Sequence, residues 1–131
     1  MNIGEAARSS GVSAKMIRYY EQAGLIQAAA RAESNYRMYT HKDVEVLRFV
    51  HQARRLGFSM KQISTLLSLW EDRNRPSREV KRLAQAHIGE LSRRIHDLTE
   101  MRDTLQYLAK HCRGDSRPDC PILEGLTEQI H

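Results

Sequence analysis

The stretch IGEAARSSGVSAKMIRYYEQAGLI, residues 3–26, decides the fold of this chain. Its beginning places small apolar residues on one face of a short helix, and Gly11 marks a tight turn after that helix. Ser13 is a suitable N-cap for a second helix that begins at Ala14, and Gly24 ends that helix. Two short helices joined by a glycine turn are the pattern of a helix-turn-helix unit.

The stretch RAESNYRMYT, residues 31–40, combines a polar segment with alternating side chains. This pattern predicts a small hairpin, or wing. Two further helices follow, because Thr40 with Asp43 and Ser59 with Gln62 each match the spacing of a capping box. We therefore expect a mainly α chain that opens with a winged helix-turn-helix domain and a second helix pair.

The expected domain boundaries follow from changes in composition along the chain. The winged domain with its second helix pair covers residues 1–70, and a polar hinge covers residues 71–77. Residues 78–110 form a long helix without proline, which Ser77 would cap. Residues 111–131 form a loop and a short C-terminal helix.

The long helix carries an apolar seam with spacings of three, four and seven residues, made of Ile88, Leu91, Ile95, Leu98 and Leu105. Such a seam is typical of a coiled coil. Nothing else in the chain is suited to cover it, so we expect a homodimer. The alternative is a helix that folds back on its own N-terminal domain.

The net charge of +5 comes entirely from the first half of the chain. Residues 1–70 carry ten basic and five acidic side chains, whereas residues 71–131 carry eleven of each. A basic helix-turn-helix domain favours double-stranded DNA as the partner, and a twofold dimer suits a palindromic site. A solvated basic surface without a partner is the simpler alternative.

The residues that we expect to contact DNA are basic or aromatic. Arginine and lysine bind phosphate, arginine can also bind guanine in the major groove, and tyrosine hydroxyls add phosphate contacts. Each such residue alone could be an ordinary surface side chain, but their clustering favours DNA contact. The set comprises Lys15, Arg18 and Tyr20 of the second helix, Arg31, Tyr36 and Arg37 of the wing, and Arg54 of the third helix.

Two other classes of protein are disfavoured by the sequence. No segment approaches the roughly 20 apolar residues that span a bilayer, and the N-terminus lacks the regions of a signal peptide. We therefore expect a cytoplasmic protein without a membrane partner. The sequence also lacks a nucleophile elbow, a phosphate loop and a three-ligand catalytic metal pattern, which argues against an enzyme.

The two cysteines of the chain lie in HCRGDSRPDC, residues 111–120. In a reducing compartment such a pair is more often a metal site or a redox switch than a structural disulfide. Cys120 precedes Pro121, which suits the first turn of a short helix, and the helix dipole would favour a thiolate there. Two thiolates suit a soft monovalent ion, whereas zinc normally takes four ligands, which here could include His111 or Asp119.

The run of residues 3–26, followed by NYRMYT at 35–40 and LGFSMKQI at 56–63, resembles the N-terminal half of the MerR family of transcriptional regulators. The order of IRYYEQAGLI, YRMY and LGFS makes the resemblance specific, and it covers nearly the whole chain. It implies an antiparallel dimerisation helix and a C-terminal effector loop. It also implies an activator that stays on its palindromic promoter with and without metal and acts there on RNA polymerase.

Within the family, the chain is similar to the copper-responsive, CueR-type members. It has Ser77 where sensors of divalent ions bring a cysteine, and it has Cys112 and Cys120 within C-x-G-D…P-D-C-P-I-L. The resemblance implies linear coordination of Cu(I), Ag(I) or Au(I) by the two thiolates, one ion per loop, and control of metal efflux or detoxification genes. The alternatives are a thiol redox sensor, a divalent-metal sensor, a sensor of a small organic ligand and a cytosolic metal carrier.

Overall fold

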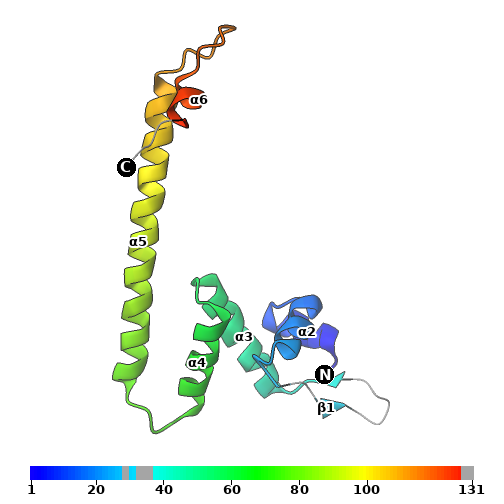
Figure 1. The fold of residues 1–131 in the computed structure, drawn as a ribbon. Helices are drawn as coiled ribbons and strands as arrows, with labels where there is room; N and C mark the ends of the chain where they lie inside the picture. Colours follow the sequence, from blue (N-terminus) through cyan, green and yellow to red (C-terminus); the bar gives the residue numbers. More distant parts are fainter. Residues whose placement is uncertain (28–29, 32–36, 128–131) are drawn as a thin grey trace. The chain divides into compact units, whose positions relative to one another are not determined.

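The computed structural model describes residues 1–27, 30–31 and 37–127 (Figure 1). Its elements are α1 (Ile3–Ser10), α2 (Ala14–Gln22), β1 (Ala30–Arg31), β2 (Arg37–Met38), α3 (His41–Arg55), α4 (Met60–Glu71), α5 (Ser77–Lys110) and α6 (Pro121–Gly125). They confirm the mainly α fold. None of the helices described is long and apolar enough to cross a membrane. The chain forms two compact units, Met1–Val80 and Lys81–His131.

The helix-turn-helix of the first unit has the ends that its sequence predicts. The side chain of Ser13 accepts a hydrogen bond from the backbone N–H of Met16 at 3.2 Å, which caps α2. Gly11 closes α1 in the left-handed conformation, with a φ of 79°. Gly24 lies just beyond α2 with a φ of 75°. Because glycine adopts such angles at little cost, both turns stay short.

Capping boxes fix the starts of α3 and α4. Thr40 Oγ1 accepts a hydrogen bond from the Asp43 N–H at 3.1 Å, and Asp43 Oδ2 accepts one from the Thr40 N–H at 2.9 Å. Ser59 and Gln62 exchange the corresponding bonds at 3.2 and 2.7 Å. These reciprocal bonds satisfy N–H groups that a helix start otherwise leaves unpaired. Both boxes were predicted from the sequence and are confirmed.

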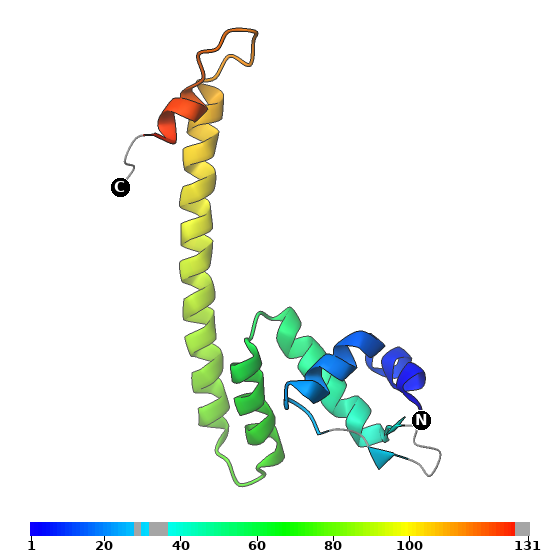
Figure 2. The same cartoon turned by 45° about the vertical axis from the view of Figure 1, so that its right-hand side comes forward.

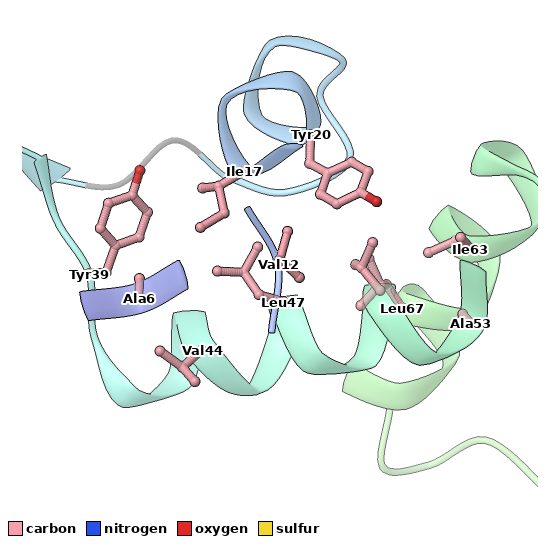
Figure 3. Packing of buried hydrophobic residues seen from close by; sticks show 11 residues of the cluster. Ala6, Val12, Ile17, Tyr20, Tyr39, Val44, Leu47, Ala53, Ile63 and Leu67 are labelled. Atoms are coloured by element: carbon pink, nitrogen blue, oxygen red, sulfur yellow. The ribbon is translucent and has the colours of Figure 1, made fainter. Parts of the chain in front are cut away.

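A buried cluster joins α1, α2, α3 and α4, and Figure 3 shows side chains of these helices pointing toward one another. Its largest fully buried members are Ile17, Leu47, Val50 and Ile63. Beside it the rings of Phe49 and Trp70 stack, with centroids 4.7 Å apart. Burying a large apolar side chain contributes about 1.5–3 kcal/mol. The cluster therefore holds α1, α2, α3 and α4 together as one unit.

The two strands of the expected wing pair antiparallel. Ala30 lies opposite Met38, and Arg31 lies opposite Arg37. This pairing confirms the hairpin predicted from the sequence. Tyr36, which we placed among the DNA-contacting residues, falls outside the described residues.

Tyr39 connects the end of the wing to α2. Its side chain is buried, and its hydroxyl donates a hydrogen bond to Glu21 Oε1 at 2.5 Å. Similarly, the guanidinium of Arg48 in α3 donates two hydrogen bonds, of 3.0 and 2.7 Å, to the carbonyl oxygen of Ser9 in α1. These bonds join residues 18 and 39 positions apart, and no local sequence pattern predicts them.

The second unit contains most of α5, together with α6. The expected cap of α5 was wrong by one residue, because Ser77 is the first residue of the helix instead of its cap. The predicted apolar seam lies exposed on the single chain: Ile88, Ile95 and Leu98 are 60%, 64% and 61% exposed. Two views agree that α6 lies beside the C-terminal end of α5 (Figures 1 and 2).

Candidate metal centre and DNA-binding face

The two cysteines face each other across the loop that joins α5 to α6. Cys112 lies two residues beyond α5, and its backbone N–H donates a hydrogen bond to the Ala109 carbonyl at 3.1 Å. Cys120 is the N-cap residue of α6, directly before Pro121. Both thiols are free, both are half-buried, and their sulfurs are 3.8 Å apart. The structure thus brings together the two cysteines that the sequence predicts to be metal ligands.

The loop favours the thiolate form of Cys120. The pKa of this thiol is lowered, chiefly because the backbone N–H of Leu123 donates a hydrogen bond to its sulfur. The Cys112 thiol and the N–H of Ile122 act in the same direction, whereas partial burial and the Glu124 carboxylate raise the pKa. Because a thiolate is the form that binds metals, the surroundings of Cys120 are compatible with a metal ligand at this position.

The donor set beside the two sulfurs is small. No group of three or more histidine, cysteine, aspartate or glutamate side chains gathers within residues 1–27, 30–31 and 37–127. The Nδ1 atom of His111 lies 2.7 Å from the Tyr107 carbonyl, and the His111 and Tyr107 rings lie 4.3 Å apart. Neither His111 nor Asp119 therefore forms a three-ligand group with the cysteines in the described part of the chain.

The separation of the sulfurs can be compared with metal–sulfur geometry. With metal–sulfur bonds of about 2.3 Å, a straight sulfur–metal–sulfur unit spans about 4.6 Å. The observed 3.8 Å is shorter by about 0.8 Å, a difference that a small change in side-chain torsion supplies. A two-coordinate ion therefore fits between these residues after a modest adjustment.

The tip of the loop is held by a local turn. Asp115 Oδ1 accepts a hydrogen bond from the backbone N–H of Arg117 at 2.9 Å, and Asp115 Oδ2 accepts one from Arg117 Nε at 3.0 Å. Both bonds lower the pKa of the Asp115 carboxyl, and the bond from the Arg117 backbone has the larger effect. Gly114 precedes the turn with a φ of 67°, which suits glycine. The tip therefore keeps its own shape without contributing a ligand.

The face of α2 expected to bind DNA is only partly as predicted. Lys15 and Arg18 are exposed, as DNA contact requires. Tyr20 is a correction, because it is only 4% exposed and Figure 3 shows it within the buried cluster. Its neighbour Tyr19 is 49% exposed. The three-residue spacing of Ile17 and Tyr20 was the available signal that both lie on the apolar face.

The other expected DNA contacts occupy mixed positions. Arg31 and Arg37 are strand residues of the wing, placed opposite each other. Arg54 is exposed near the end of α3, with its Nη1 atom 3.4 Å from Met60 Sδ. Ser77, the expected selectivity residue, is exposed at the start of α5. These four assignments stay predictions.

Comparison with known proteins gives the family. A family model described as "MerR HTH family regulatory protein" matches residues 1–70, and one described as "MerR, DNA binding" matches residues 44–108. The chain belongs to the MerR family. Members of the MerR family are transcription regulators, so this chain is a transcription regulator and not an enzyme.

Similar proteins extend the comparison within the MerR family. The chain is 61% identical over 127 residues to heavy metal-dependent transcription regulator 2 of Rhizobium meliloti (strain 1021), covering 97% of this chain and 86% of that relative. It is 39% identical over 131 residues to the HTH-type transcriptional regulator CueR of Salmonella typhimurium (strain LT2), covering 100% and 95%. The relative named for heavy metals in general is thus more similar than CueR.

One solved structure supports the fold over almost the whole chain. The transcription regulator PbrR691 from Ralstonia metallidurans CH34, in complex with lead(II), matches with a TM-score of 0.83 and 28% identity. The match covers 96% of this chain and 98% of that one. The long helix α5 is accordingly the MerR-type helix that the sequence resemblance led us to expect.

Proposed function

We propose that this MerR-family regulator is a homodimeric activator that responds to Cu(I), with Ag(I) and Au(I) as chemical equivalents. In the cytoplasm it binds a palindromic promoter operator and, with one ion per loop, enables RNA polymerase to transcribe metal efflux or detoxification genes. The observation that carries the proposal is the pair of free thiols 3.8 Å apart, with no three-ligand group formed around them in the described residues.

The donor set favours a monovalent ion. Zinc in a structural site normally takes four ligands, and the described loop gathers only Cys112 and Cys120. With a monovalent ion, two thiolates carry one net negative charge, which the N–H groups of Leu123 and Ile122 partly offset at Cys120. By the family resemblance, Ser77 of the partner subunit would stand where sensors of divalent ions bring a third thiolate, and hydroxyl oxygen is a poor ligand for soft metals.

The exposed seam of α5 supports the homodimer. Apolar residues that recur at coiled-coil spacing and stay exposed on one chain are normally covered by a second helix. A twofold dimer places two copies of α2 on two half-sites of a palindrome. Lys15 and Arg18 are the exposed basic residues of α2 that would contact DNA.

Activation requires that metal binding be coupled to the shape of the promoter. Bending or untwisting a site of this size costs about 1–6 kcal/mol. In the mechanism that the family resemblance implies, the operator lies in a spacer that is too long for RNA polymerase to engage both promoter elements. Each extra base pair of this spacer displaces the two promoter elements by about 3.4 Å and rotates them by about 34° relative to each other. Closure of the loop by two thiolates supplies a binding free energy that can bias two DNA conformations of similar energy.

The experiment is an anaerobic titration with Cu(I), Ag(I), Zn(II) and Pb(II) against competing chelators, combined with transcription from an operator template. Cys112→Ser and Cys120→Ser should abolish tight monovalent binding and activation while operator binding persists. Ser116→Ala, in the same loop, is the matched control and should respond as wild type. Tighter binding of Zn(II) or Pb(II) than of Cu(I) would assign a divalent sensor, the alternative suggested by the lead(II) complex of PbrR691.

A further inference from the structure

Gly125, the last residue of α6, makes an unusually close approach to α5. A Cβ atom built on Gly125 would lie 2.7 and 2.9 Å from the two Cδ atoms of Leu108 and 3.4 Å from its Cγ. Carbon atoms in contact are normally separated by about 3.5–4.0 Å. Gly125 is also buried. A side chain at this position would therefore require α6 or the Leu108 side chain to move.

Both sides of this contact are connected to the cysteines by short, ordered segments. Cys120 begins α6, and its carbonyl oxygen accepts a hydrogen bond from the Glu124 N–H at 3.1 Å, so its backbone moves with α6. Cys112 is tied to the end of α5 by its bond to Ala109, one residue after Leu108. The separation of the two sulfurs therefore depends on how α6 is seated on α5.

We infer that the contact of Gly125 with Leu108 sets the distance between the Cys112 and Cys120 sulfurs, which makes both residues positioning residues for metal binding. This inference rests on the proposed function, in which the two cysteines hold the metal. The turn at the tip of the loop is a second local restraint. Its bonds join Asp115 to Arg117 only, so it does not fix α6 against α5.

The substitution Gly125→Ala tests whether a side chain at this position weakens or improves metal binding. Gly125 lies within a helix, where alanine is favoured over glycine by its helix propensity. If propensity alone mattered, Gly125→Ala would stabilise α6 and leave metal binding intact or improved. If the close approach matters, the added methyl group collides with Leu108 and displaces α6, so metal binding weakens. The two explanations predict opposite results.

The experiment uses the full-length protein with Gly125→Ala, Leu108→Ala and the double variant. We expect Gly125→Ala to weaken Ag(I) and Cu(I) binding about tenfold, the effect of moderate overpacking. The double variant should regain affinity to within about threefold of Leu108→Ala, because the colliding atoms are gone. Leu126→Ala, at a 68% exposed position directly after Gly125, is the control and should bind as wild type.

A second readout avoids metal altogether. A short bifunctional thiol reagent should link Cys112 to Cys120 more slowly in metal-free Gly125→Ala than in wild type, and the double variant should recover the rate. A cross-linking rate and a metal affinity of Gly125→Ala equal to those of wild type would overturn the inference. A loss of metal affinity in Gly125→Ala that is not restored in the double variant with Leu108→Ala would overturn it as well. If wild type binds no monovalent ion through these cysteines, the proposed function fails, whereas the linking rates still decide the role of the contact.

Discussion

The hydrogen bond between Tyr39 and Glu21 gives a prediction whose size follows from the structure. Tyr39→Phe removes only the hydroxyl that lies 2.5 Å from the Glu21 carboxylate, and the tyrosine ring is 96% buried, since its exposure is 4%. Hydrogen bonds to charged groups contribute about 1.5–3 kcal/mol. Because Glu21 is partly exposed, we expect a loss of about 1.5–2 kcal/mol, from the lower part of that range.

In a domain of this size that loss lowers the melting temperature by about 6–16 °C. The measurement is thermal and urea unfolding followed by circular dichroism, at one fixed protein concentration because dimerisation also affects stability. Tyr19→Phe is the matched control, since Tyr19 is 49% exposed on the same helix as Glu21. A Tyr39→Phe protein as stable as Tyr19→Phe would refute the reasoning and remove this bond as the connection between wing and α2.

Three further predictions concern the seam, the DNA-binding face and the thiols. Leu98→Glu places a charge in the α5 seam and should convert the dimer to monomer in analytical ultracentrifugation; an unchanged dimer would exclude the seam as the interface. Arg18→Ala should weaken operator binding at least fivefold with and without metal and flatten its salt dependence; equal affinity in gel-shift titrations would remove Arg18 from the interface. In the Cys112→Ser variant, the lowered pKa of Cys120 leaves more of this thiol as thiolate at pH 7. The alkylation of Cys120 should therefore be faster in the folded variant than in the same variant unfolded in urea. Equal rates would show that the Leu123 N–H does not stabilise the thiolate.

The features predicted correctly from the sequence are those set by neighbouring residues. The capping boxes at Thr40 and Ser59, and the glycine turns at Gly11 and Gly24, depend on side chains within three positions of each other. The pairing of the cysteine sulfurs was also predictable, because a short loop bounded by two helices limits where they can lie. Local chemistry was sufficient in each case.

The features that were missed depend on contacts between distant residues. The bonds from Tyr39 to Glu21 and from Arg48 to Ser9 arise only when the helices have packed. Tyr20 was assigned to DNA because tyrosine suits both a phosphate contact and a core, and only packing decides between them. The close approach of Gly125 to α5 was likewise invisible, because a glycine near a helix end is ordinarily explained as a terminator.

The exposed seam of α5 has a genetic consequence if the protein works as a dimer. A chain with a damaged thiol loop and an intact seam still pairs with normal chains, so with both chains made in equal amounts about three quarters of the dimers would carry a defective subunit. Such an allele would be dominant over the wild type. An allele that destroys the seam would instead be recessive, because its product never enters a dimer.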